Sequence, residues 1–231
     1  DDYQNAAFFL SDVQRKAARA VMRCKSGKLG MNFNHCDDCG HISAHYNSCR
    51  NRNCPNCQAV SKELWVDKRR SEVIDSPYFH VVFTLPHELN SLIYCNQTLL
   101  YGLLHRCCAE TLLELSADKK WLGATPGIIQ VLHTWNQELD YHVHMHCIVS
   151  GGGLKKDGKI RKSSSNFFIR TEVLRDKFKG KYMNHLSSLY NSGTLKFSSA
   201  CEKLRNSYYW WEWKDNLYKK EQEKNQGNRQ Y

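Results

Sequence analysis

The residues best suited to chemistry are three histidines at alternate positions, His142, His144 and His146. Because successive side chains of a β-strand point to opposite faces, this spacing predicts a strand that presents three imidazoles on one face. Neutral imidazole is a common metal ligand, and two rings about 6–7 Å apart along a strand can share one ion. The pattern predicts a divalent-metal site, against the simpler alternative of a half-buried strand with surface histidines.

Two histidines leave coordination positions open, and a hard ion such as Mg²⁺ or Mn²⁺ prefers oxygen ligands. Gln137 precedes His144 by seven residues and is the predicted oxygen ligand, with Glu138 as the alternative. We interpret His133 as a supporting or core residue rather than a ligand. The glycine run 151–153 follows the histidine strand, and we expect it to let the backbone approach a ligand closely.

A second group of candidate ligands consists of cysteines. The pairs Cys36–Cys39 and Cys54–Cys57 each have CxxC spacing and are separated by fourteen residues, which is typical of a zinc ribbon. We predict one structural Zn²⁺ on these four thiolates. Cys49 is a fifth candidate, and the sequence leaves open whether it replaces one of the four, joins a second site or simply packs. The remaining cysteines lack ligand spacing and are predicted to be small buried hydrophobic residues: Cys24, Cys95, Cys107, Cys108, Cys147 and Cys201.

The chain is basic, with a net charge of +10 over 231 residues. Residues 154–185 follow the histidine strand and carry ten basic and three acidic side chains, a net charge of +7. Such a patch suits the neutralisation of nucleic-acid phosphates. We therefore predict DNA contacts from Lys155, Lys156, Arg161 and Lys162, and from Arg50 and Arg52 beside the second CxxC pair.

These residues need elements to position them. Hydrophobic periodicity and turn residues predict an α+β chain with two domains, at residues 1–75 and 76–231. The expected elements are a helix over 5–25, a zinc-ribbon-like module, a charged helix over 60–73, a strand over 79–85, a long helix over 89–115, a strand over 127–135, the histidine strand, a helix over 172–190 and a short strand over 195–197. The order β-α-β-β-α-β of the second domain is that of a ferredoxin-like sandwich with an antiparallel sheet.

The sequence has no feature that predicts a membrane protein. No segment reaches the roughly 18 apolar residues that span a bilayer, and the first residues lack the features of a signal peptide. We expect a cytoplasmic protein. Because the first residue is Asp1 rather than Met, we also expect a trimmed or partial chain.

Four blocks of sequence resemble the transposases of the insertion sequence 91 family. They are Tyr46-Asn-Ser-Cys-Arg-Asn-Arg-Asn-Cys-Pro-Asn-Cys-Gln58, Tyr78-Phe-His-Val-Val-Phe-Thr-Leu-Pro86, Leu132-His-Thr-Trp-Asn-Gln137 and His142-Val-His-Met-His-Cys-Ile-Val-Ser-Gly-Gly-Gly153. The blocks occur in order, and the resemblance runs from about residue 10 to about residue 218. It implies an HUH-type, rolling-circle transposase with an N-terminal zinc-binding domain, acting in the bacterial cytoplasm at the nucleoid.

The resemblance also implies a chemistry. His144 and His146 would be the metal pair, Gln137 the third ligand and His142 an adjacent supporting residue. A tyrosine hydroxyl would attack a phosphodiester of single-stranded DNA at an element end, with Mg²⁺ or Mn²⁺ neutralising the phosphate. In the family this tyrosine lies in a Tyr-Leu-Gly-Arg-Tyr-like helix, and residues 154–231 contain no such segment. We therefore expect a chain that is truncated at its C-terminus and lacks the nucleophile.

Two other classes of function remain open. A metal-dependent hydrolase could use the histidine strand with water as the nucleophile, although the sequence offers no clear acidic cluster for a second metal. A non-catalytic zinc-ribbon DNA-binding protein derived from a transposase would also fit a truncated chain.

Overall fold

We analysed a computed structural model of the chain, which describes residues 11–163 and 169–227, and the side chains as far as residue 217. The chain divides into two compact units, Asp1–Val73 and Ile74–Tyr231.

Residues 11–73 of the first unit form two helices and a hairpin: α2 (Asp12–Arg23), β1 (Met31–His35), β2 (Ile42–Tyr46) and α3 (Pro55–Ser71). Helix α2 begins at a capping box, in which the Ser11 hydroxyl accepts from the Gln14 N–H and the Gln14 side chain accepts from the Ser11 N–H. Residues 5–10 of the helix expected over 5–25 lie outside the described residues.

The hairpin and α3 bring the cysteines to defined positions. Strands β1 and β2 pair antiparallel from Met31 with Tyr46 to His35 with Ile42, so the first CxxC pair lies in the turn that joins them. Helix α3 has Cys54 as its N-cap and Pro55 in its first turn, where the fixed φ of proline suits a helix start. The second CxxC pair therefore sits at a helix N-terminus, the positive end of the helix dipole.

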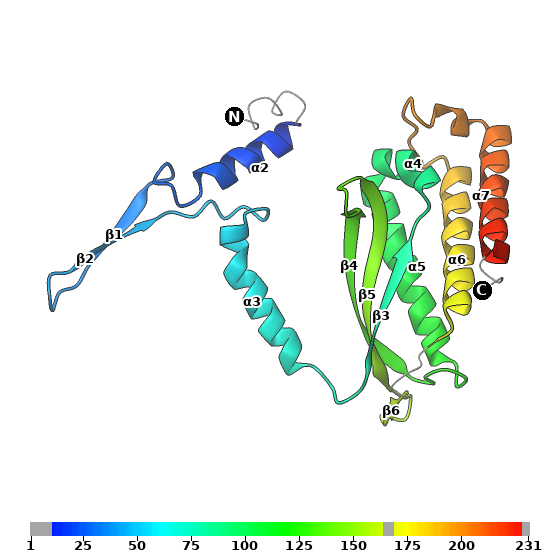
Figure 1. The fold of residues 1–231 in the computed structure, drawn as a ribbon, viewed down its shortest axis with the longest axis horizontal. Coiled ribbons are helices and arrows are strands. Elements are labelled where there is room, and N and C mark those ends of the chain that lie inside the picture. The colour runs from blue at the N-terminus through cyan, green and yellow to red at the C-terminus, as the bar shows by residue number, and fades with distance from the viewer. Residues whose placement is uncertain (1–10, 164–168, 228–231) are drawn as a thin grey trace. The chain divides into compact units, whose positions relative to one another are not determined.

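The second unit contains a sheet with helices on one side (Figure 1). Its elements are β3 (Tyr78–Thr84), the 3₁₀ helix η2 (His87–Leu89), α4 (Asn90–Cys95), α5 (Gln97–Ala117), β4 (Thr125–Trp135), β5 (Tyr141–Leu154), β6 (Ile160–Lys162), α6 (Thr171–Asn191), the 3₁₀ helix η3 (Glu202–Arg205) and α7 (Ser207–Gly227).

Strand β5 lies in the middle of the sheet, antiparallel to β3 on one side and to β4 on the other. Strands β3 and β4 therefore run parallel to each other with β5 between them and α4 and α5 as the connection, which is a split β-α-β arrangement. The expected α+β class with an antiparallel sheet is confirmed.

The alternation of β5 decides what each face of the sheet does. Val143, Met145, Cys147 and Val149 are buried and form a core with Phe83 and the apolar faces of the helices. The intervening histidines face the opposite side, which none of the described helices of this unit covers (Figure 1). The core thus fixes the strand that presents the histidines.

Two expected elements differ in the structure. The long helix over 89–115 is broken at Asn96, and residues 195–197 form no strand. One cause explains both differences, because the Asn96 side chain donates to the Lys196 carbonyl (2.7 Å) and accepts from the Lys196 N–H (2.8 Å). The segment around Lys196 is thereby attached to the helix break instead of to a sheet edge. Helix α7 and strand β6 were not predicted from the sequence.

Candidate metal centres

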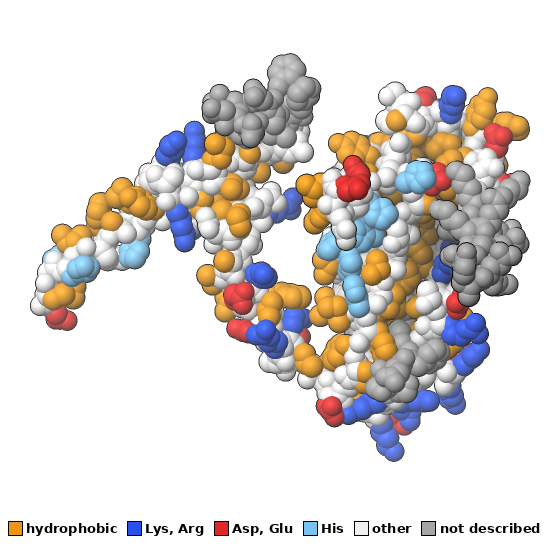
Figure 2. All heavy atoms as spheres, in the orientation of Figure 1, with side chains coloured by type: hydrophobic (Ala, Val, Ile, Leu, Met, Phe, Trp, Pro, Cys, Tyr) orange, Lys and Arg blue, Asp and Glu red, His pale blue; other side chains and the backbone are white. Residues whose placement is uncertain are grey.

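Three histidines converge on the open face of the sheet. His133, His144 and His146 place one ring nitrogen each within 4.8 Å of the others. Their ring centroids are 4.3 Å apart for His133 and His146, and 4.9 Å for His144 and His146. Figure 2 shows histidine side chains gathered in one patch on this unit. The predicted histidine pair is therefore accompanied by a third imidazole.

Strand register explains why the third histidine is His133. In the β4–β5 ladder His133 lies directly opposite His144, whereas the last pair before the turn is Trp135 with Tyr141. Gln137 lies in the turn beyond that pair, about 10 Å along the strand from the level of His144 at about 3.3 Å per residue. Among the described residues the cluster thus contains His133, which we interpreted as a supporting or core residue, and it does not contain Glu138. Gln137 as an oxygen ligand stays a prediction.

The hydrogen bonds of two cluster histidines leave their Nε2 atoms available. His144 Nδ1 lies 3.1 Å from the backbone carbonyl of His142, and His146 Nδ1 lies 2.8 Å from Nε2 of His80. Burial and the neighbouring histidines His133, His144 and His80 lower the pKa of His146. A lowered pKa favours neutral imidazole, the form that binds metals. These three side chains fit a divalent ion.

The side chain of His142 is adjacent to the cluster and is not part of it. The centroid of its ring lies 5.1 Å from that of His144. His142 is not one of the three histidines whose ring nitrogens converge. The histidine on the neighbouring strand, His80, had not been singled out from the sequence.

The first unit contains a second convergent group, formed by Cys24, Cys49, Cys54 and Cys57, whose sulfur atoms all lie within 4.8 Å of one another. The Sγ atoms of Cys24 and Cys57 are 3.5 Å apart, and those of Cys49 and Cys57 are 3.6 Å apart. Zinc–sulfur bonds of about 2.3 Å in a tetrahedron place the sulfur atoms about 3.8 Å apart. The four thiols therefore fit a structural Zn²⁺.

The thiols of this group influence one another. Burial opposes ionisation of Cys57, but hydrogen bonds from Cys24 and Cys49 outweigh it and lower its pKa to about 7. The Asn51 N–H lowers the pKa of Cys49, while burial and the three neighbouring thiols raise it to about 12. One thiol of the group ionises easily and a second does not. A bound cation would favour the ionised form of all four thiols, because coordinated thiols are deprotonated.

Two of the four zinc ligands predicted from CxxC spacing belong to the four-thiol group and two do not. Cys54 and Cys57 belong to the four-thiol group, whereas Cys36 and Cys39 lie in the turn between β1 and β2 and are replaced in it by Cys24 and Cys49. Cys24 is the C-cap of α2 and its Sγ accepts from the Cys49 N–H (3.5 Å). No spacing pattern marked Cys24, because thirty-two residues separate it from Cys57.

The glycine run after the histidines packs against its own sheet. A Cβ on Gly151 would meet Phe79 at 2.8 Å, and a Cβ on Gly153 would meet the Thr125 carbonyl oxygen at 2.6 Å. All three glycines are buried. The run is therefore needed for close strand packing, and the expected approach to a ligand is not what the structure shows.

The predicted DNA-binding cations occupy two places. Arg50 and Arg52 are exposed beside the cysteine group. Lys155, Lys156, Arg161 and Lys162 lie on the β5–β6 hairpin, where Lys155 pairs with Asp157 (2.9 Å) and Lys162 pairs with Asp75 (2.7 Å). Lys156 and Arg161 are exposed.

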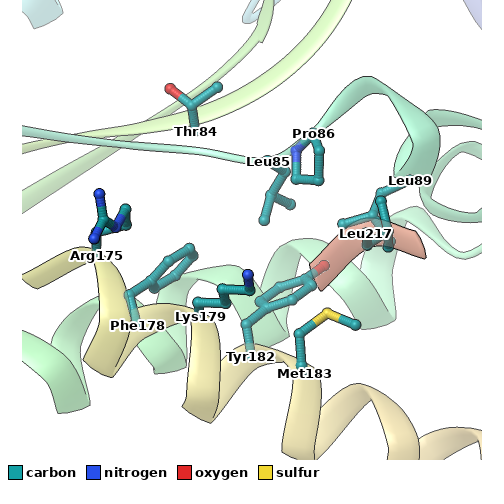
Figure 3. A pocket seen from close by; sticks show the side chains of 10 residues that line it. All are labelled: Thr84, Leu85, Pro86, Leu89, Arg175, Phe178, Lys179, Tyr182, Met183 and Leu217. Carbon is teal, nitrogen blue, oxygen red and sulfur yellow. The ribbon is translucent and has the colours of Figure 1, made fainter. Parts of the chain in front are cut away.

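The described tyrosines do not complete a nucleophilic centre, because none of their hydroxyls is hydrogen-bonded to a cluster histidine. Tyr182 lies on the helical side, in a pocket lined by Phe178, Leu89 and Leu217 (Figure 3). Burial, with nearby Cys107 and Cys108, raises its pKa. Tyr190 donates to the Arg205 carbonyl, and the hydroxyls of Tyr101 and Tyr141 bond to each other. The side chain of Tyr218, and all of Tyr231, lie outside the described residues.

None of the helices in residues 11–163 and 169–227 combines the length and the apolar character needed to cross a bilayer.

Comparison with known proteins places these features in a family. A family model described as "Transposase zinc-binding domain", of insertion sequence 91, matches residues 1–85, and one described as "Putative transposase" matches residues 127–226. A protein of Sinorhizobium fredii named "Putative transposase y4qJ" is 42% identical over 202 residues, covering 86% of this chain and 51% of that protein. The transposase for insertion sequence element IS801 of Pseudomonas savastanoi pv. phaseolicola is 32% identical over 168 residues, covering 72% of this chain and 39% of that protein.

The chain thus spans about half or less of the length of these relatives. Among solved structures, the conjugative relaxase TrwC in complex with oriT DNA, metal-bound, has 20% sequence identity and a TM-score of 0.38, covering 48% of this chain and 43% of that chain. The first family model covers the four cysteines of the thiol group, and the second covers the three histidines of the other group. The chain belongs to the transposase family of insertion sequence 91.

Proposed function

We propose that the protein is a rolling-circle transposase that binds single-stranded ends of its element and cleaves and rejoins them through a tyrosine, using a divalent metal. The observation that carries this proposal is the group His133, His144 and His146 on the open face of the sheet. Mg²⁺ or Mn²⁺ bound there would withdraw charge from a scissile phosphate and stabilise its transition state.

The surroundings of the three histidines favour a nucleic acid with unstacked bases. Val82, Val131 and Ile148 are each 44% exposed on the same face, and Trp135 is 49% exposed with its ring stacked on His133. Bases of a single strand can stack on aromatic rings and cover apolar surface, which paired bases cannot do. This face therefore supports binding of a single strand rather than a duplex.

The cationic residues supply the complementary charge. Lys156 and Arg161 on the β5–β6 hairpin, and Arg50 and Arg52 near the cysteine group, are exposed and suited to phosphates. In this proposal the first unit, held by Zn²⁺ on Cys24, Cys49, Cys54 and Cys57, contributes to DNA recognition. The protein would act on DNA at the bacterial nucleoid.

The identity of the nucleophile separates two versions of the proposal. None of the described tyrosine hydroxyls is hydrogen-bonded to a histidine of the group: that of Tyr182 is buried, and those of Tyr101, Tyr141 and Tyr190 are bonded elsewhere. This favours, as a second candidate function, a DNA-binding protein of transposase ancestry whose metal site does not cleave by itself.

One experiment distinguishes the two. The protein is mixed with a labelled single-stranded element end and Mn²⁺, and covalent protein–DNA adducts are sought after denaturation. An adduct that disappears in the double variant His144→Ala/His146→Ala supports the transposase, and peptide mapping of the adduct identifies the tyrosine. Metal-dependent binding without any adduct supports the second candidate.

A further inference from the structure

His80 on β3 contacts the histidine group from the neighbouring strand. Its Nε2 lies 2.8 Å from Nδ1 of His146, and the two rings are stacked with centroids 5.0 Å apart and an angle of 13° between their planes. His80 is not one of the three convergent ligands. His80 contacts one of these ligands, His146, from outside the group.

The direction of this hydrogen bond follows from the chemistry of imidazole. A neutral ring carries its proton on one nitrogen and a free lone pair on the other. His146 can bind a metal through Nε2 only if its proton is on Nδ1, and that N–H then donates to Nε2 of His80. If His80 donated instead, the Nε2 of His146 would be protonated and closed to the metal. Metal binding thus requires His80 as an acceptor.

The choice of an imidazole as acceptor has an electrostatic consequence. Metal-bound histidines often donate to a carboxylate, which adds a negative charge close to the ion. With that tautomer the Nδ1–H of His144 donates to a carbonyl and the Nδ1–H of His146 donates to the ring of His80, and no carboxylate belongs to the group among the described residues. A divalent ion held by these neutral groups would retain its full charge toward a phosphate.

We propose that His80 is a positioning residue that holds His146 in its metal-binding tautomer without offsetting the charge of the metal. This inference rests on the proposed function, because it assumes that the three-histidine group binds a divalent metal that faces a phosphate.

The test compares three substitutions at residue 80 in the full chain, with Mn²⁺ affinity measured by electron paramagnetic resonance. His80→Ala removes the acceptor, and we expect Mn²⁺ to bind about tenfold more weakly, at the lower end of the range of 10–100-fold for outer partners, because His80 is exposed. His80→Gln keeps an acceptor oxygen at similar reach and should restore most of the affinity. Urea unfolding of the second unit serves as the folding control, and His87→Ala removes an exposed histidine elsewhere on the same unit.

His80→Glu tests the electrostatic half. We expect this variant to bind Mn²⁺ more tightly than the wild type, because the carboxylate adds negative charge. The same charge should reduce the gain in affinity that Mn²⁺ gives for an oligothymidylate of about ten nucleotides. Opposite signs for these two measurements would not result from a merely structural defect.

Equal Mn²⁺ affinity for the wild type and His80→Ala would overturn the positioning role, and equal oligothymidylate gains for the wild type and His80→Glu would overturn the electrostatic role. Either result leaves the proposed function standing, provided that Mn²⁺ binding still depends on His144 and His146. Conversely, the expected order of affinities without any cleavage of an element end would support the inference on His80 and contradict the transposase.

Discussion

The two units of the chain each gather metal ligands, but they differ in what else holds them together. In the described part of the first unit the only buried side chains are two cysteines of the zinc group, Cys24 and Cys54, and neither α2 nor α3 contains a buried residue. In the second unit a continuous apolar core lies between the sheet and the helices, with Met145 and Trp210 fully buried. The cysteine group is thus the core of its unit, whereas the histidine group lies on the surface of an already stable one.

Metal binding therefore serves two different purposes in the two units. Burial of apolar surface is the main favourable contribution to folding, and a small unit that cannot bury enough of it needs another source of free energy. Zinc binding provides such a source. The histidine strand does not need it, because Val143 and Met145 fix the strand from the opposite face.

Removal of the zinc is the most direct test of whether the first unit depends on its metal group for folding and the second does not. Because structural zinc contributes about 10–16 kcal/mol of binding free energy to small modules, chelation or Cys54→Ser should unfold the first unit and leave the second folded. Backbone amide resonances of residues 11–73 should collapse to the positions of unfolded chain, while those of 74–217 persist. A first unit that stays folded without zinc would contradict the proposed role of the cysteine group.

A second test distinguishes the two possible ligand sets. Cys24→Ser/Cys49→Ser should abolish zinc binding and unfold the first unit, whereas Cys36→Ser/Cys39→Ser should retain one zinc and the fold. Elemental analysis and circular dichroism of the two purified variants provide the measurement. The reverse outcome would restore the ligand set expected from CxxC spacing and show that the turn between β1 and β2 closes onto α3.

The histidine group should show the opposite behaviour. His144→Ala/His146→Ala removes two of three ligands, so we expect Mn²⁺ binding to be lost while zinc content is unchanged. The free energy of unfolding of the second unit should change by less than about 1 kcal/mol, because substitutions at partly exposed positions outside the core have small effects. Unfolding in urea measures the stability, and a large loss would mean that these histidines also support the core.

The sequence predicted the parts of both centres that depend on local spacing. The alternation of His142 to His146 is a property of one strand, and the pair Cys54 and Cys57 belongs to one helix start, so both could be predicted without a fold. His133 required the register of the β4–β5 hairpin, which contains an irregularity between His133 and Trp135. Cys24 required the return of the chain from β2 to the end of α2, which no periodicity encodes.

The strand expected over 195–197 failed for a similar reason. Its apolar residues suit a strand, but the backbone of Lys196 is bonded to the side chain of Asn96, one hundred residues earlier in the chain. A single buried amide therefore decides a local conformation that propensity alone assigns to the sheet. Tertiary contacts of this kind override local preference.

The assignment of the third ligand can be sharpened with a matched pair of variants. His133→Ala should weaken Mn²⁺ binding by about 10–100-fold, comparable to the loss of an important supporting group, whereas Gln137→Ala should leave it unchanged. Isothermal titration of both variants against Mn²⁺ measures this, and His105→Ala offers a control for a histidine on the helical side of β4. Loss of affinity in Gln137→Ala alone would restore the expected oxygen ligand.

The smallest expected effect concerns the cations of the two units. Each phosphate contact to a single strand contributes about 0.7 to the slope of log affinity against log salt concentration. Lys156→Ala/Arg161→Ala should therefore lower that slope by up to about 1.4, and Arg50→Ala/Arg52→Ala should do the same if the first unit also follows the strand. Lys155→Ala should matter less, because Lys155 already pairs with Asp157. Filter binding of a labelled single strand at several salt concentrations measures the slopes. A reduction confined to Arg50 and Arg52 would assign phosphate binding to the zinc unit and leave the histidine face to contact bases alone.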